Sequence, residues 1–160
     1  MDFFDLHCDT LTECMDDGDS LLKNERDIDF ERGSIFGRWN QVFAVFVPDS
    51  MDDSLVEGYF DSACDFYFDE LKKKGDVFPI LSSEDVRGHS RGVMLAMESS
   101  RGVGSLERLE KLYERGLRLI TLTWNHKNRA AGGCDEGGGL TDWGRELVSK
   151  MEKLGIVTDV

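Results

Sequence analysis

Short runs of apolar residues alternate along this chain with longer segments whose apolar residues recur at helical spacing. The run Val-Phe-Ala-Val-Phe-Val at residues 42–47 is apolar at every position. That composition is typical of a strand buried on both faces of a parallel sheet. A strand–helix–strand order favours parallel strands joined by right-handed crossovers, so we expect an α/β fold.

The expected strands cover residues 2–8, 42–47, 93–98, 117–123 and 156–160, and the expected helices cover residues 51–74, 105–115 and 142–154. Asp49 and Ser50 offer N-cap oxygens to the first of these helices, and Thr141 offers one to the last. Gly155 is expected to end that last helix. Pro79 makes the apolar segment 77–81 a connector or an edge piece.

The length of the chain limits the fold further. With 160 residues, 40% of them hydrophobic, it can bury the core of one domain, and we expect residues 1–160 to form a single domain. A complete (β/α)₈ barrel usually takes roughly 250 residues. About five strands of this kind therefore predict an incomplete TIM-like barrel.

Charge and cysteine content exclude several classes of function. The net charge is −13, and residues 1–85 hold 22 acidic and 7 basic side chains, which would repel nucleic acid and anionic membrane surfaces. The longest apolar run, residues 42–47, is too short to span a bilayer. The four cysteines, which show no C-x-x-C spacing, are expected to be free thiols in a reducing cytoplasm.

Polar side chains gather at the carboxyl ends of three expected strands. His7 and Asp9 lie at the end of the first, Glu98 ends the third, and Trp124-Asn125-His126 follow the fourth. Residues i and i+2 of a strand share a face, so the His7 imidazole and the Asp9 carboxylate should point the same way, an arrangement that suits a divalent metal such as zinc. Parallel α/β folds build their sites at this edge of the sheet.

Five glycines between residues 132 and 139 mark the loop after the fourth strand. No Gly-Lys-Ser/Thr follows them, so an active-site loop is favoured over a phosphate-binding loop. Cys134 lies in this loop and is expected to be an exposed thiol, whereas Cys8 should face away from His7 into the core.

At this point the sequence resembles the membrane (renal-type) dipeptidases of peptidase family M19. Asp5-Leu6-His7-Cys8-Asp9-Thr10 resembles the family's opening D-x-H-x-D-T, and Met97-Glu98 resembles the strand end that supplies a bridging glutamate. Three further stretches match in order: residues 41–47, the segment Leu122-Thr123-Trp124-Asn125 with Asn128, and Gly139-Leu140-Thr141-Asp142-Trp143-Gly144 followed by Met151 and Leu154-Gly155-Ile156.

The resemblance implies a metal-dependent hydrolase barrel with a binuclear zinc site. His7 and Asp9 would bind one metal, and Glu98 would bridge both as the catalytic carboxylate. Two zinc ions about 3.5–4 Å apart can hold a hydroxide and polarise the scissile carbonyl of a dipeptide. The implied substrates are dipeptides, including those with a C-terminal D-residue.

Two departures from the family pattern bear on the site. Many members have a substrate-contacting His at the position of Trp124, so either His126 partly replaces it in a substrate-binding set with Trp124 and Asn125, or Trp124 packs and His126 is an exposed loop residue. The family also continues D-[LVI]-S-H where this chain has Asp159-Val160. We therefore expect an N-terminal dipeptidase portion that is inactive by itself and needs a C-terminal half. The alternative is a non-catalytic half-barrel that self-associates.

Overall fold

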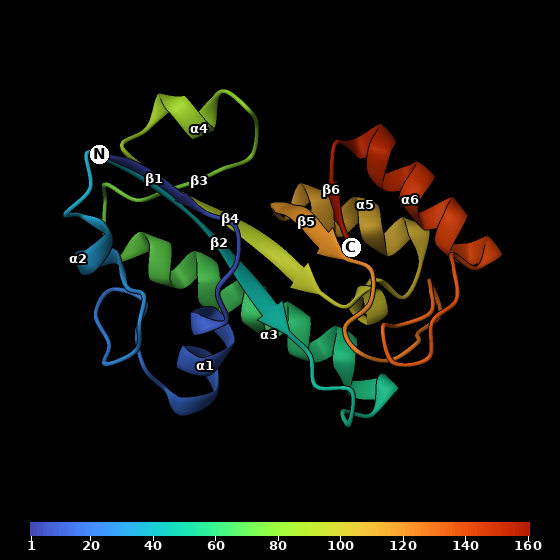
Figure 1. The fold of residues 1–160 in the computed structure, drawn as a ribbon. Helices are drawn as coiled ribbons and strands as arrows, with labels where there is room; N and C mark the ends of the chain where they lie inside the picture. Colours follow the sequence, from blue (N-terminus) through green and yellow to red (C-terminus); the bar gives the residue numbers. More distant parts are fainter. The chain divides into compact units, whose positions relative to one another are not determined.

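The computed structural model describes residues 1–160, and Figure 1 shows its elements. The strands are β1 (Asp2–Asp5), β2 (Arg38–Phe46), β3 (Phe78–Pro79), β4 (Arg91–Glu98), β5 (Leu117–Thr121) and β6 (Val157–Asp159). The helices are α1 (Thr10–Asp17), α2 (Phe30–Gly33), α3 (Asp53–Lys72), α4 (Asp85–Gly88), the 3₁₀ helix η1 (Ser100–Val103), α5 (Leu106–Glu114) and α6 (Asp142–Leu154). None of these helices is both long and apolar enough to cross a membrane.

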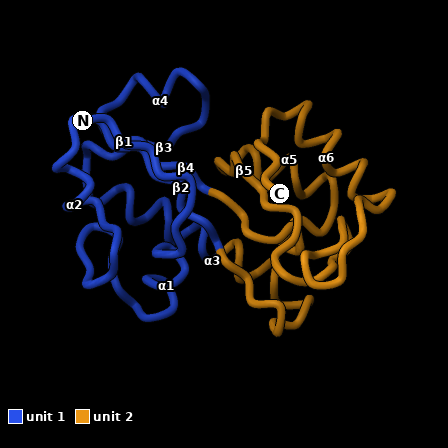
Figure 2. Tube along the Cα trace, viewed as in Figure 1, with its two compact units in different colours: residues 1–45, 62–95 blue, residues 46–61, 96–160 orange.

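The chain divides into two compact units, coloured separately in Figure 2. The first unit holds residues 1–45 and 62–95, and the second holds residues 46–61 and 96–160. Each unit thus combines segments that are distant in sequence, and both α3 and β4 contribute residues to each. A single domain over residues 1–160 stays a prediction.

The strands pair in the order β1-β2-β4-β5-β6, and β3 pairs with β4 beside this path. The pairs β1–β2, β3–β4 and β5–β6 are parallel, which confirms the expected α/β class. In the register of the first pair, Asp5 lies opposite Gln41. In the last pair, Thr121 lies opposite Asp159.

The core of the first unit forms around aromatic side chains of β2. The Phe30 ring meets the rings of Trp39 and Phe43 edge-on, with centroid distances of 6.4 and 6.1 Å. Gly33 lies directly beneath Trp39, because a Cβ added there would come within 2.4 Å of the indole ring. A side chain at position 33 would therefore displace the tryptophan from the core.

The helices of the second unit begin and end with the signals that their sequences carry. The Thr141 side chain accepts a hydrogen bond from the Gly144 N–H at the start of α6, and Gly155 ends this helix at φ 79°. Both features confirm the expected boundaries. Arg108 and Arg115 reach from α5 and its C-cap to the Asp61 carboxylate on α3, at 3.1 and 2.6 Å.

Four helices were not predicted, and some boundaries were wrong. The helices α1, α2, α4 and η1 are short, between four and eight residues, so their apolar periodicity is weak. The expected caps Asp49 and Ser50 do not start α3; instead the Asp52 carboxylate accepts from the Ser54 N–H. The first four residues of β2 were not predicted as strand because the sequence is polar there. Their polar side chains have partners in the structure: Arg38 pairs with Asp2, and Asn40 donates to the Val86 carbonyl.

Candidate metal centre

His7 and Asp9 lie together just beyond the end of β1. The imidazole Nε2 is 3.4 Å from the Asp9 Oδ1, and both side chains are substantially exposed. Between them, Cys8 continues the pairing with β2: its N–H donates to the Val42 carbonyl at 3.1 Å, and its carbonyl accepts from the Ala44 N–H at 2.9 Å. The main chain is therefore held on both sides of the residue that separates the two candidate ligands.

Helix α1 fixes the main chain of Asp9. The Asp9 carbonyl accepts from the Glu13 N–H and the Thr12 hydroxyl, while the Asp9 carboxylate makes no capping hydrogen bond to the helix. The carboxylate is thus not used as an N-cap, although aspartate commonly takes that role.

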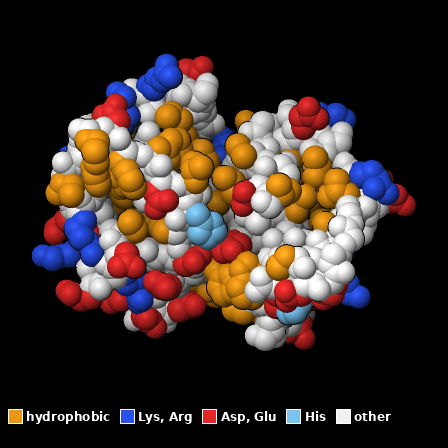
Figure 3. Space-filling model, viewed as in Figure 1, with side chains coloured by type: hydrophobic (Ala, Val, Ile, Leu, Met, Phe, Trp, Pro, Cys, Tyr) orange, Lys and Arg blue, Asp and Glu red, His pale blue; other side chains and the backbone are white.

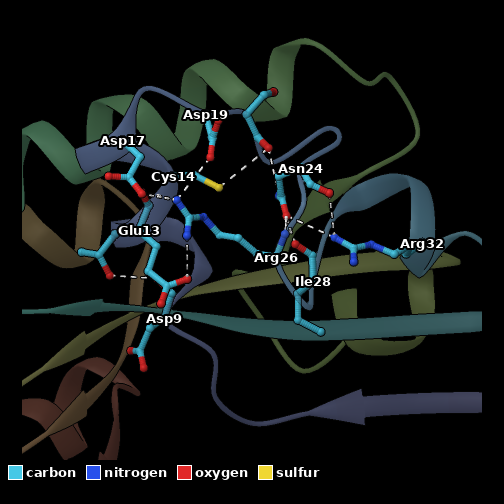
Figure 4. Close-up of polar contacts among 11 residues, drawn as sticks. Asp9, Glu13, Cys14, Asp17, Asp19, Asn24, Arg26, Ile28 and Arg32 are labelled. Carbon is cyan, nitrogen blue, oxygen red and sulfur yellow. Dashed lines mark hydrogen bonds and ion pairs between the residues drawn. The ribbon is translucent and has the colours of Figure 1, made fainter.

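Arg26 secures the same helix, as Figure 4 shows. Its guanidinium donates to the Asp17 carboxylate at 2.5 Å, to Asp19 at 3.2 Å and to the Glu13 carbonyl at 3.1 Å. The hydrogen bond to Asp17 is the largest cause of the raised pKa of Arg26. The loop after α1 therefore returns to bind the helix that begins at Thr10, directly after Asp9.

A carboxylate and a buried amide lie beside His7. The Asp5 Oδ1 accepts from the His7 N–H at 3.4 Å, and the Asp5 Oδ2 accepts from the Gln41 Nε2 at 2.9 Å. Sequence reasoning assigned no role to Gln41. The signal available was a polar amide directly before the apolar run of β2.

Glu98 is the last residue of β4 and belongs to the second unit, so its joining His7 and Asp9 stays a prediction. The turn after it is unusual: Ser99 has φ 75°, the one non-glycine residue with a positive φ. Asn128 holds this turn, because its Nδ2 donates to the Leu122 carbonyl at 2.7 Å and lies 3.3 Å from the hydroxyls of Ser99 and Ser100. Asn128 is a further residue that the sequence motif contained but did not explain.

Trp124, Asn125 and His126 lie in the loop after β5. The Trp124 ring is 39% exposed and packs edge-on against Phe46, with a centroid distance of 5.1 Å. The exposed His126 imidazole is surrounded by carboxylates: its Nδ1 is 3.3 Å from Glu136 and 3.6 Å from Asp135, and its Nε2 is 4.0 Å from Asp49.

Glycines let this loop fold back on itself. A Cβ at Gly133 would lie 2.2 Å from the Asn125 carbonyl oxygen, and one at Gly132 would lie 1.9 Å from that of Gly137. The Asp135 N–H donates to the Asn125 carbonyl at 3.0 Å. The glycines are thus explained by close main-chain packing, and they position the segment that carries Trp124 and His126.

The donor set of the first unit fits a divalent metal. An imidazole nitrogen beside a carboxylate oxygen is a ligand pair that zinc accepts. Cys8 is a poor third ligand, because burial raises the pKa of its thiol to about 12 and metals bind the thiolate. Cys134 is an exposed free thiol in the second unit, as expected.

Comparison with known proteins gives one family. The family model described as membrane dipeptidase (peptidase family M19) matches residues 1–160. Among solved structures, the chain is similar to a dipeptidase described as a metallopeptidase of family M19, with a TM-score of 0.83 and 17% identity over 99% of this chain and 57% of that one.

Two proteins from Pseudomonas aeruginosa have related folds. The probable dipeptidase PvdM gives a TM-score of 0.75 at 19% identity, covering 90% of this chain and 42% of its own. An amidohydrolase gives 0.67 at 18% identity, covering 97% of this chain and 44% of its own. The chain therefore spans about half the length of these structures, and it has the α/β fold of part of a TIM-like barrel.

Proposed function

Because the chain belongs to the membrane dipeptidase family, peptidase family M19, we propose that it forms the N-terminal part of a zinc-dependent dipeptidase site. The observation that carries this proposal is the His7–Asp9 pair, which lies at the strand end where the family pattern has its first metal ligands. Both side chains are substantially exposed, and the Asp9 carboxylate does not cap the helix that follows it.

In this proposal the residues of the chain have separate tasks. His7 and Asp9 would hold one zinc ion, Glu98 would be the carboxylate shared with a second, and Trp124, Asn125 and His126 would contact the dipeptide. Zinc bound there would supply a hydroxide at neutral pH and polarise the peptide carbonyl. The cytoplasmic location expected from the cysteine pattern stays a prediction.

The family pattern continues beyond this chain with further metal-binding histidines and a substrate-binding Arg and Asp. We therefore expect the 160-residue chain alone to bind zinc weakly and to hydrolyse dipeptides poorly, because three ligands cannot complete two coordination shells. Loss of substrate positioning alone can cost about 10²-fold in rate.

Zinc titration tests the proposed ligand. His7→Ala should abolish the binding that the unaltered chain shows, whereas His89→Ala should not, because the His89 ring stacks on Phe78 at 4.1 Å outside the site. Equal zinc binding by all three proteins would refute the assignment. Hydrolysis of L-Ala-D-Ala and L-Ala-L-Ala, with and without the separately expressed C-terminal half of a related enzyme, then tests for a split enzyme.

One observation favours the second candidate, a non-catalytic half-barrel that self-associates. β1 lies at one end of the strand order, and Figure 3 shows apolar side chains at the surface near it. Phe3, Phe4 and Leu6 are 39, 40 and 65% exposed. Open strand edges with apolar side chains invite pairing. A dimer in solution that persists with zinc but has no activity in the mixture would favour this candidate.

A further inference from the structure

Gln41 is a fully buried amide directly before the apolar stretch of β2. Its side chain has no solvent exposure, and residues 42–45 that follow it are all buried. Burying an amide costs free energy unless hydrogen bonds compensate. An apolar side chain of the same size would avoid that cost, so the contacts of this amide indicate what it contributes.

The Gln41 amide contacts both acceptors that hold the His7 segment. Its Nε2 donates to the Asp5 Oδ2 at 2.9 Å and to the Val42 carbonyl at 3.1 Å. Both partners are acceptors only, so the orientation of the amide follows from the hydrogen-bond network. The amide oxygen, Oε1, is buried without a hydrogen-bond partner, so the donor end accounts for the polar contacts of this side chain.

Those two acceptors receive successive main-chain N–H groups. The Asp5 carboxylate accepts from the His7 N–H at 3.4 Å, and the Val42 carbonyl accepts from the Cys8 N–H at 3.1 Å. One amide thus holds the acceptor on each side of the His7 peptide unit. The β1–β2 register supports this arrangement because it sets Asp5 opposite Gln41.

We propose that Gln41 is a positioning residue for the His7 ligand, acting through Asp5 and the Val42 carbonyl. This inference rests on the proposed function, in which His7 binds zinc. Without the amide, the Asp5 carboxylate can rotate away from the His7 N–H. The main chain at His7 then samples other directions, and its imidazole spends less time beside Asp9.

The test compares Gln41→Met with Asn40→Ala. Methionine keeps the approximate length of glutamine but removes the donor. Asn40 is the neighbouring buried amide on β2, and its Nδ2 donates to the Val86 carbonyl instead of to the His7 segment. Both variants lose a buried hydrogen bond and are expected to be less stable in urea. Only Gln41→Met should weaken zinc binding, by about 10-fold, the lower range for partners that orient metal ligands.

A second measurement does not depend on metal. Hydrogen exchange of the His7 and Cys8 amides, followed by NMR in the metal-free chain under native conditions, should accelerate several-fold more in Gln41→Met than in Asn40→Ala. Unchanged exchange at both amides, or a zinc affinity that falls equally in the two variants, would overturn the proposal. His7→Ala tests the proposed function separately from the role of Gln41. If that variant keeps full zinc binding, the proposed function fails. The exchange data alone then decide whether Gln41 positions His7.

Discussion

Replacement of Glu70 tests how the first unit holds the segment that follows α1. Glu70 is 1% exposed on α3, and its Oε2 accepts from the Leu21 N–H at 2.9 Å and from the Ser20 hydroxyl. Its Oε1 pairs with Lys73, whose side chain is half-exposed. One carboxylate thus fixes residues 20–21, which lie in the sequence between the end of α1 and Arg26.

The expected cost follows from these partners. In Glu70→Ala the Leu21 N–H is left buried without an acceptor, which costs about 1–3 kcal/mol. The lost Lys73 pair adds little because a surface partner is screened by water. With the void left by the side chain, we expect a total of about 2–4 kcal/mol. Glu70→Gln keeps one acceptor oxygen and should cost about 1 kcal/mol.

Urea denaturation followed by circular dichroism gives these free energies of unfolding. Asp69→Ala is the matched control, because Asp69 is the adjacent residue of α3, is exposed and pairs with the exposed Lys72. It should change stability far less than Glu70→Ala does, because an exposed ion pair contributes little. A Glu70→Ala variant as stable as Asp69→Ala would show that the buried carboxylate does not hold the segment.

Two further predictions concern the turn after Glu98 and the acid stability of the first unit. Ser99→Gly should be more stable than Ser99→Ala by about 1 kcal/mol in urea, the reverse of the usual order, because Ser99 has φ 75°; the usual order would show that the turn is unstrained. Hydrogen bonds from Leu81 and Ser82 lower the pKa of the Asp85 carboxyl, so its contribution to stability is present above the unfolded-state pKa of about 3.9 and is lost as the pH falls through the lower folded-state pKa. Asp85→Asn should therefore lose less stability than the unaltered chain between pH 5 and acid conditions, and equal losses would contradict this assignment.

The sequence predicts best those elements whose signals are local and continuous. The boundaries of α6 could be predicted because Thr141 and Gly155 flank one regular apolar stripe. Residues 42–47 indicated β2 because no helix signal competes with an apolar run bounded by Pro48. The start of β2 was missed because Arg38 and Asn40 find partners outside the strand, at Asp2 and Val86, which the local pattern does not indicate.

The same distinction applies to the candidate site. The spacing of His7 and Asp9 predicted that their side chains lie together, and they do, although β1 ends at Asp5 and both residues follow it. The residues that hold these ligands act over longer separations: Gln41 reaches Asp5 across 36 positions, and Asn128 reaches Ser99 across 29. In the sequence alone, nothing distinguishes either amide from an ordinary polar residue.

Gln41 and Asn128 both act on the main chain next to a candidate metal ligand. A metal ligand binds well only if its side chain is already oriented toward the metal, and the orientation of His7 depends on the peptide units on either side of it. At His7 those units are held by acceptors that Gln41 engages, and at Glu98 the following peptide is held in a strained turn by Asn128. Both amides donate to a main-chain carbonyl and to a side-chain oxygen at once. Because an amide keeps its hydrogen-bonding state across the pH range in which zinc ligands titrate, it can fix the main chain without competing for the metal or for a proton.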